Sequence, residues 1–140
     1  MNFAYVDSSV FLRRLLREPL PEVDLSAFER LYTAQILELE CRRVLDRIRI
    51  QERIPDEELA QRYLELQEQL QAIYQIRLSQ PIFKRSCESF PVVVRSLDSI
   101  HLSSFIVVQK TVKPEGKWVF ITHDLKLKAA AETLGFETTG

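Results

Sequence analysis

The hydrophobic positions at the start of the chain predict a strand followed by a helix. Residues 2–6, NFAYV, form an apolar run of strand length that stops at Asp7. The next segment, SSVFLRRLLRE, places apolar residues at helical spacing with arginines between them, and the prolines of PLP at 19–21 end it. Asp7 therefore stands at the junction of a strand and a helix.

The same arrangement recurs near the other end of the chain. KWVFIT at 117–122 has the composition of a buried strand and leads into HD, which ends at Asp124. LKLKAAAETLG at 125–135 follows with a helical pattern, and Gly135 suits the position just after the C-cap. Asp124 thus occupies the same kind of junction as Asp7.

The segments between these ends alternate between helical and extended patterns. TAQILELECRRVLDRIRIQE (33–52), with Thr33 as a cap, and PDEELAQRYLELQEQLQAI (55–73) predict two long helices that form a hairpin. IYQIRLS (73–79) predicts a strand, and PIFKRSCESF (81–90) a short helix. Strands spaced by helices indicate an α/β protein with a mostly parallel central sheet covered on both faces.

VRSLDSIHLSSF (94–105) predicts a further helix and raises the question of why it holds an acid. With Ser96 as N-cap, Asp98 lies in the first turn and projects between Leu102 and Phe105. The helix dipole alone would stabilise an acid there by roughly 0.3–1 kcal/mol. Burial between apolar neighbours is nevertheless costly unless another group compensates the charge.

Glu40 is a second acid on an inward helix face. It shares a row with Ile36, Val44 and Ile48, next to an arc of Leu37, Cys41 and Leu45, whereas Glu38 lies on the flank toward Arg42. One interpretation of Glu40 is a partly buried acid that pairs with Arg43 or Arg47. The other is a functional carboxylate that faces the same site as Asp98.

Asp7 and Asp124 also allow two interpretations, because aspartate is a favoured N-cap residue. In a parallel sheet, however, ligand sites form at the carboxyl ends of strands, and both acids fall there. Two carboxylates about 4 Å apart repel by roughly 4 kcal/mol at an effective dielectric of 20, and a divalent cation would remove that cost. Oxygen ligands suit Mg²⁺ or Mn²⁺, whose chemistry points toward phosphodiester hydrolysis.

Composition bounds these hypotheses. The 140 residues are 46% hydrophobic and 28% charged, which predicts one globular domain over residues 1–140. The net charge of −1 gives no global basic field, and it decides nothing about nucleic acid. The three glycines exclude both the dinucleotide fingerprint GxGxxG and the phosphate loop GxxxxGK[ST].

Cysteine content and hydropathy indicate a reduced, cytoplasmic protein. Cys41 and Cys87 lie far apart without CxxC spacing, so we expect buried, reduced thiols rather than a zinc or redox site. Asp7 interrupts the first apolar run before it reaches the length of a signal peptide. No later stretch approaches the roughly 18 apolar residues of a membrane span.

Four motifs taken in order give the chain a family resemblance. The segments YVDSSVFLRRLL, LELECRRVL, RSLDSIHLSS and FITHDLKLKAAAETLGF together resemble the PIN-domain family, in particular the VapC-type toxins of bacterial toxin–antitoxin pairs. The resemblance covers nearly the whole chain. It implies a three-layer α/β/α fold and a Mg²⁺- or Mn²⁺-dependent endoribonuclease, with an antitoxin as protein partner and a homodimer as assembly.

The resemblance also implies a set of site residues. The acids that match the family are Asp7, Glu40, Asp98 and Asp124, and the supporting polar positions are Ser8 and Thr122. By similarity, Asp7 and Asp98 are the principal metal ligands, Asp124 a further ligand or water-holder, and Glu40 an orienter of metal-bound water. Leu125 and Lys126 follow Asp124 where some members carry an extra acid, so a full second metal site is not supported.

Other residues are candidates for contacts with RNA or a partner. Between residues 42 and 53, five arginines face only two acids, and Arg42, Arg43 and Arg47 either track an RNA backbone or form a solvated helix face. His101 is expected to pack or to form hydrogen bonds, and a direct chemical role is expected neither for it nor for His123, which precedes Asp124 in the sequence. An antitoxin would lie between the first helix and the hairpin, where the candidate contacts are Phe11, Leu12, Leu59 and Tyr63.

Two other functions compete with the nuclease. A PIN-like module that has lost catalysis would serve in binding or assembly, and the presence of all four acids argues against it. A phosphatase of the haloacid-dehalogenase type would also place an aspartate after its first strand. That family needs a second aspartate two residues later, where this chain has Ser9.

Overall fold

The computed structural model describes residues 2–19, 23–112 and 114–140. A parallel five-stranded sheet runs through its middle in the order β3-β2-β1-β4-β5. The strands are β1 (Asn2–Val6), β2 (Arg30–Ala34), β3 (Tyr74–Ile76), β4 (Lys117–Ile121) and β5 (Thr138–Thr139). The helices are α1 (Ser8–Leu15), α2 (Ile36–Gln51), α3 (Asp56–Gln71), α4 (Gln80–Ser86), α5 (Ser96–Thr111) and α6 (Leu125–Thr133), with a short 3-10 turn at Leu25–Ala27.

Alternation along β1 divides the core between the two faces of the sheet. Ala4 and Val6 point to one face, and Phe3 and Tyr5 point to the other, because successive side chains of a strand face opposite ways. All four are buried. A central parallel strand is covered on both sides, which explains why NFAYV is apolar throughout.

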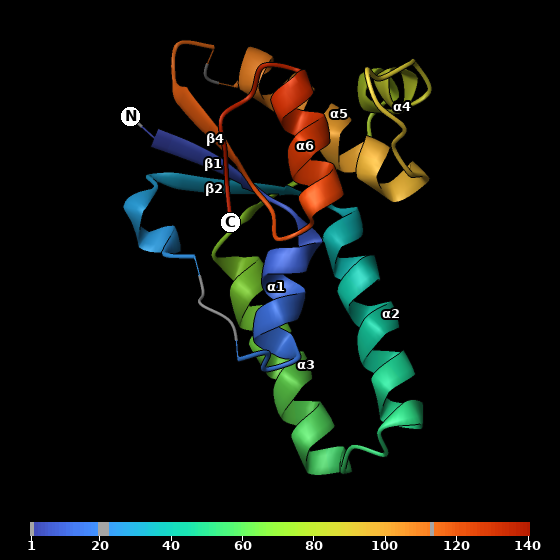
Figure 1. Ribbon diagram of the computed structural model, residues 1–140. Coiled ribbons are helices and arrows are strands. Elements are labelled where there is room, and N and C mark those ends of the chain that lie inside the picture. Colours follow the sequence, from blue (N-terminus) through green and yellow to red (C-terminus); the bar gives the residue numbers. More distant parts are fainter. Residues whose placement is uncertain (1, 20–22, 113) are drawn as a thin grey trace.

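Helices α1, α2 and α3 cover the first face. Their buried side chains meet Ala4 and Val6 of β1 in one hydrophobic cluster, with Phe11, Leu45 and Leu66 among its members. Figure 1 shows α2 and α3 as the two arms of a hairpin that projects beyond the sheet. The predicted hairpin is therefore confirmed.

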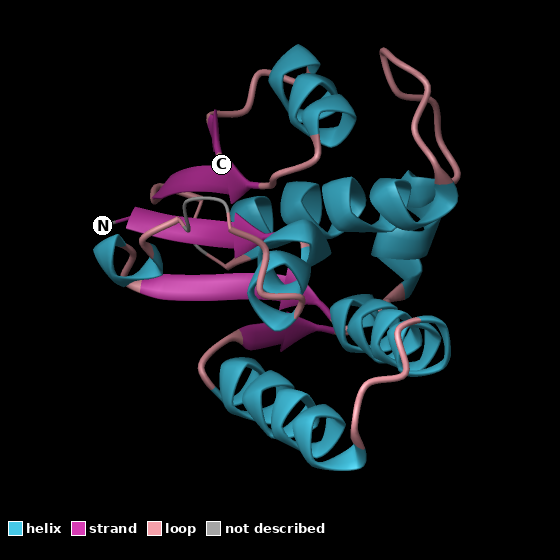
Figure 2. Ribbon diagram, turned by 60° about the horizontal axis from the view of Figure 1, so that its bottom comes forward, coloured by secondary structure: helices cyan, strands magenta, loops and turns pink. Residues whose placement is uncertain are grey.

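Helices α5 and α6 cover the second face. Leu102 and Phe105 of α5 and Leu127 of α6 pack on Tyr5 and Phe120 of the strands, and α4 packs on the outside of α5. Figure 2 shows the sheet lying between these helices and those of the first face. The chain is thus an α/β protein of three layers, as the sequence predicts.

Two strands, β2 and the two-residue β5, were missing from the sequence prediction. Residues 30–34 form β2, whereas the pattern had placed the start of a helix at Thr33. Thr33 is buried in the strand, and its Oγ1 donates a hydrogen bond of 2.7 Å to the carbonyl oxygen of Val6. Helix α2 starts only at Ile36, and no side chain caps it.

Several boundaries and burial predictions also need correction. Ser96 is the first residue of α5 rather than its N-cap, a position that Arg95 takes, although Asp98 remains in the first turn. The strand predicted over 73–79 shrinks to β3, and Cys87 is exposed because it follows the end of α4. Of the predicted PLP stop, residues 20 and 21 lie outside the described ranges.

The ends of the last helix agree with the sequence. Asp124 is the N-cap of α6, and Gly135 follows its C-cap with a φ of 86°, a left-handed conformation that glycine adopts without steric cost. None of the helices described here combines the length and the hydrophobicity needed to cross a bilayer.

Candidate functional site

Asp7 lies directly after β1, at the carboxyl edge of the sheet. It is the N-cap of α1 and is almost completely buried. Its Oδ2 accepts hydrogen bonds from the hydroxyls of Ser9 and Thr122, each at 2.8 Å, and from the Ser9 amide at 3.3 Å. Asp7 is therefore both a helix cap and an anchored carboxylate, so the two interpretations of this residue are compatible.

The ends of β1 and β4 are tied together through the same hydroxyls. The amide of Asp124 donates to Thr122 Oγ1 at 3.0 Å, and the amide of His123 donates to Ser9 Oγ at 2.9 Å. Thr122 was expected as a supporting residue, whereas Ser9 was missed. A hydroxyl two positions after a capping aspartate is a common local pattern, and only the fold shows that it also reaches the neighbouring strand.

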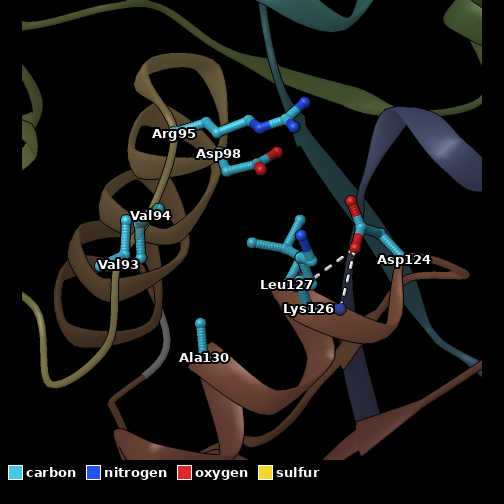
Figure 3. Close-up of a pocket in the computed structure, with 8 residues that line it drawn as sticks. All are labelled: Val93, Val94, Arg95, Asp98, Asp124, Lys126, Leu127 and Ala130. Carbon is cyan, nitrogen blue, oxygen red and sulfur yellow. Dashed lines mark hydrogen bonds between the residues drawn. The ribbon is translucent and has the colours of Figure 1, made fainter.

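Asp124 caps α6 with one oxygen and leaves the other toward a cavity. Its Oδ1 accepts from the amides of Lys126 and Leu127 at 2.9 and 3.2 Å, while no residue in the described ranges donates to Oδ2. Figure 3 shows the carboxylates of Asp124 and Asp98 on opposite sides of that cavity. The two acids lie 26 positions apart in the sequence, one in α5 and one at the N-cap of α6, and both line this cavity.

Glu40 is held by two side chains from other elements. Its Oε1 lies 2.6 Å from His101 Nε2, and its Oε2 accepts from Ser8 Oγ at 3.0 Å. Ser8 Oγ also lies 3.4 Å from Asp7 Oδ1, so it links both acids. One interpretation had expected Glu40 to pair with Arg43 or Arg47. In the structure it pairs with His101 instead.

His101 is fully buried in the middle of α5 and uses both ring nitrogens. Nδ1 lies 2.7 Å from the hydroxyl of Tyr5, which in turn accepts from the Ala34 amide at 3.0 Å. Burial lowers the pKa of His101, but the hydrogen bond to Glu40 and the charges of Asp7 and Glu40 outweigh it, and the pKa is raised overall. The expectation that His101 forms hydrogen bonds is confirmed, and its partner is a candidate site residue.

The inward helix face of α2 differs slightly from the predicted one. Leu37, Cys41 and Leu45 are completely buried, so the arc next to Glu40 is the true core-facing stripe. Glu40 lies at the margin of that stripe, with 16% of its side chain exposed. This position lets its carboxylate reach the edge of the sheet rather than the core.

Asp98 is a half-buried acid without a compensating partner. No side chain or amide in the described part of the chain donates a hydrogen bond to it. Burial raises the pKa of Asp98 to about 6, and the negative charges of Asp7 and Asp124 act in the same direction. His101 acts in the opposite direction without outweighing them. The first turn of the helix therefore does not by itself account for this acid.

The four acids gather at one edge of the sheet without forming a closed metal cage. Asp7, Asp124 and Glu40 all act electrostatically on Asp98. Among residues 2–19, 23–112 and 114–140, however, no three His, Cys, Asp or Glu side chains converge as a ready-made set of metal ligands. Mg²⁺ is usually bound through one or two carboxylates and keeps several waters, so an open arrangement of oxygen donors is compatible with a hydrated cation.

A cavity of about 480 Å³ opens beside Asp98 and Asp124. Its other walls combine exposed cations with aliphatic side chains, and the residues that line it are Val93, Val94, Arg95, Asp98, Asp124, Lys126, Leu127 and Ala130. Arg95 and Lys126 were not among the predicted site residues. Arg95 lies three positions before Asp98, at the N-cap of the same helix, so helical spacing could have indicated it. Lys126 belongs to α6 and joins the cavity wall only in the folded chain.

The three candidate arginines of α2 have different surroundings. Arg42 pairs with Glu38 at 2.8 Å, and Arg43 pairs with Asp46 at 3.1 Å. Arg47 instead lines a second cavity, of about 370 Å³, together with Leu12, His123 and Asp124. Of the three, Arg47 is the one placed beside the acids.

The candidate contacts for a protein partner divide into two groups. Phe11 and Leu59 are buried in the core between the sheet and its first helical layer. Leu12 and Tyr63 are only partly buried at the edge of that core. A partner could therefore touch Leu12 and Tyr63 without disturbing the fold, whereas Phe11 and Leu59 are packing residues.

Comparison with known proteins supports the fold. No family model and no curated protein matches the chain. Among solved structures, a chain of VapBC2 from Rickettsia felis, crystallised bound to a DNA fragment from its promoter, is similar with a TM-score of 0.67. The match covers 98% of this chain and 97% of the other at 11% sequence identity. The three-layer architecture is thus the VapC/PIN-like fold that the sequence resemblance implied.

Proposed function

We propose that this protein is a Mg²⁺- or Mn²⁺-dependent endoribonuclease that hydrolyses phosphodiester bonds of RNA. The observation that carries the proposal is that Asp98 and Asp124 line one cavity while Asp98 receives no hydrogen bond from the described residues, and burial together with Asp7 and Asp124 raises the pKa of Asp98 to about 6. An acid kept in such surroundings lowers the stability of the protein unless a cation binds there. The donor set is made only of carboxylates, which favours a hard divalent cation.

The chain's own residues supply the binding and the orientation. Asp7, Asp98 and Asp124 would hold the cation, because Asp7 and Asp124 lie close enough to Asp98 to raise its pKa through their charges. When bound, such a cation polarises a phosphoryl oxygen and lowers the pKa of a coordinated water. Ser9 and Thr122 fix the carboxylate of Asp7 by hydrogen bonds of 2.8 Å.

Glu40 is the residue that we assign to orienting the attacking water. Ser8 and His101 each hold one of its oxygens, so the carboxylate has a single orientation. A fixed carboxylate can accept a proton from water more effectively than a mobile one. His101 and Tyr5 would then position Glu40 through their hydrogen bonds, without contacting RNA.

We further propose that the protein is the toxin of a toxin–antitoxin pair. The fold likeness to a chain of VapBC2, a toxin–antitoxin complex, supports this class of partner. The antitoxin would bind over α1 and the α2–α3 hairpin, where Leu12 and Tyr63 are partly exposed. A homodimer is the assembly that the same resemblance implies.

The alternative is a PIN-like module without catalysis that acts in binding or assembly. The four acids and the unfavourable charge of Asp98 favour the nuclease. A module that only binds a partner would not need a carboxylate that lowers the stability of the fold. Purified protein incubated with a mixed RNA pool tests the choice. Cleavage that requires Mg²⁺ or Mn²⁺, stops with EDTA and is lost in Asp7→Asn supports the nuclease.

Asp7→Asn suits this test because asparagine is as good an N-cap as aspartate. Asp46→Asn is the matched control, since Asp46 is partly exposed on α2 and its partners are surface contacts away from the four acids, namely Arg43 at 3.1 Å and the hydroxyl of Tyr63, which donates to it at 3.4 Å. Absence of cleavage under either metal, with protein shown to be free of antitoxin, would favour the binding module.

A further inference from the structure

The cavity between the start of α5 and α6 is lined by three kinds of side chain: acidic, basic and aliphatic. Two acids of the proposed cation site form one side, and Arg95 and Lys126 provide exposed positive charges. Val93 and Val94 face Leu127 and Ala130 across the remaining space (Figure 3). At about 480 Å³, the cavity lies within the range of roughly 300–1,000 Å³ that is typical of small-molecule sites.

The exposure of Val93 is the feature of this wall that packing within the protein does not explain. Its side chain is fully exposed, although it is a branched hydrophobic residue at the rim of a cavity. Val92, its neighbour, is 39% exposed and does not line the cavity. Burying an exposed apolar side chain under a flat, partly apolar ligand is favourable.

The charges around the cavity narrow the chemistry of that ligand. Arg95 and Lys126 match an anion such as a phosphodiester, whereas the aliphatic residues match an uncharged, planar group. The carboxylates of Asp98 and Asp124 lie next to both. A nucleotide joins these features in one unit, with its phosphate near the cations and its base against the aliphatic wall.

We propose that this cavity binds the unpaired nucleobase adjacent to the scissile phosphate of single-stranded RNA. The inference rests on the proposed nuclease function and adds a site of base recognition to it. Single-stranded RNA is recognised chiefly through bases that are turned out of the stack, so a base pocket beside the acids restricts cleavage to unpaired segments. The aliphatic wall contacts the faces of the base and does not read its hydrogen-bonding edge.

Methyl resonances give a readout that does not depend on cleavage. The Asp7→Asn protein, which lacks the anchored carboxylate but keeps the cavity, is titrated with the dinucleotide ApA and, separately, with ribose 5-phosphate. We expect saturable shifts of the Val93, Val94, Leu127 and Ala130 methyl signals with ApA and much smaller shifts with ribose 5-phosphate. Equal shifts with both compounds, or none with ApA, would overturn the proposal.

Two pairs of variants separate the base from the phosphate contribution. Val93→Ser should weaken ApA binding about fivefold, while Val92→Ser should leave it unchanged. Lys126→Ala should weaken ApA and ribose 5-phosphate alike, while Lys128→Ala, one position outside the cavity wall on the same helix, should affect neither. Equal effects of Val93→Ser and Val92→Ser would contradict a base site at Val93.

Cleavage assays distinguish this proposal from the function on which it rests. An RNA that the wild-type protein cuts is resynthesised with an abasic residue at each position around the cut. Loss of cleavage at one adjacent position supports the base pocket, and uniform cleavage along the series refutes it while leaving the nuclease intact. Base-dependent methyl shifts in a protein that cuts no RNA would retain the pocket and refute the nuclease.

Discussion

His101 Nε2 lies 2.6 Å from Glu40 Oε1, and this contact joins two helices that cover opposite faces of the sheet. The residues are 61 positions apart in the chain, and His101 is fully buried. Its other ring nitrogen holds the hydroxyl of Tyr5 in β1. The carboxyl edge of the sheet is therefore braced by a polar network that runs from one helical layer through the central strand to the other.

Replacing His101 should destabilise the protein strongly. His101→Leu removes one hydrogen-bond partner each from the Glu40 carboxylate and the buried Tyr5 hydroxyl, which costs about 2–3 kcal/mol of the free energy of unfolding. Urea denaturation measures this loss. His123→Leu is the matched control and should cost less than about 0.5 kcal/mol, because His123 contributes its backbone amide rather than its ring to the site.

Rescue distinguishes a positioning role of His101 from simple packing. His101→Gln keeps a donor toward Glu40, so it should retain more RNA cleavage than His101→Leu when both are compared at a temperature where each is folded. Equal activity of the two variants would show that the contact with Glu40 does not matter for the reaction.

The pH dependence of stability should report the raised pKa of Asp98. Burial and the charges of Asp7 and Asp124 raise this pKa from 3.8 to about 6, so the folded protein binds the proton more tightly than the unfolded chain. In EDTA, Asp98 therefore has little effect on the free energy of unfolding below about pH 4. It lowers that free energy as the pH rises through about 6. Asp98→Asn should remove this cost.

The measurement is the difference in unfolding free energy between Asp98→Asn and wild type at about pH 4.5 and about pH 7.5. The variant should gain about 1 kcal/mol relative to wild type at the higher pH, a value reduced from the full shift because solvent still screens part of the carboxyl. A difference that does not change with pH would contradict an uncompensated charge at Asp98.

Divalent cations should stabilise the folded protein through the same acids. At a free Mg²⁺ concentration about 100 times its Kd, binding adds about 2.7 kcal/mol and raises the Tm of the wild type. The thermal shift should disappear in Asp7→Asn and persist in Asp46→Asn. Equal shifts in all three proteins would indicate nonspecific binding of the cation.

The arginines of α2 should differ in their effect on RNA. Arg47 lines the cavity beside Asp124, whereas Arg43 is paired with Asp46 on the exposed side of the helix. Arg47→Ala should weaken RNA binding and reduce the slope of log K against log salt by about one. Arg43→Ala should leave both quantities unchanged, and equal losses in the two variants would place the RNA elsewhere.

Antitoxin binding should depend on Leu12 of α1, which is partly exposed. Leu12→Asp places a charge on the proposed contact surface while leaving the buried Phe11 intact. We expect the affinity for the antitoxin to fall at least tenfold, measured by titration calorimetry, with an unchanged circular dichroism spectrum. Unchanged affinity would remove α1 from the interface.

Local patterns explain why much of the fold could be predicted from the sequence. NFAYV is followed directly by Asp7, and KWVFIT is followed by His123 and then Asp124, so the strand, the cap and the helix are all visible within a short window. The segment RLYTA was missed because only Gln35 separates it from α2, and Thr33 then resembles a helix cap. The two residues of β5 are too few to show any period.

The sequence indicated the four candidate acids by two kinds of signal, the inward helix faces of Glu40 and Asp98 and the element junctions at Asp7 and Asp124. Asp7 and Asp124 follow strands, and the carboxyl ends of parallel strands share one edge. The link between Glu40 and His101 has no local signal, because nothing within either helix specifies the other. Lys126 reaches the cavity from α6 in the same way, so only the folded chain places it beside Asp98.

The most direct test of the central claim is the rate at which wild-type and Asp98→Asn proteins cut a mixed RNA pool in Mg²⁺ or Mn²⁺. Asp98→Asn should be at least as stable as the wild type at neutral pH, so a loss of activity cannot be a loss of folding. We predict metal-dependent cleavage by the wild type, abolished by EDTA and reduced at least 100-fold in the variant. Equal cleavage by the two proteins, or cleavage that survives EDTA, would contradict the account.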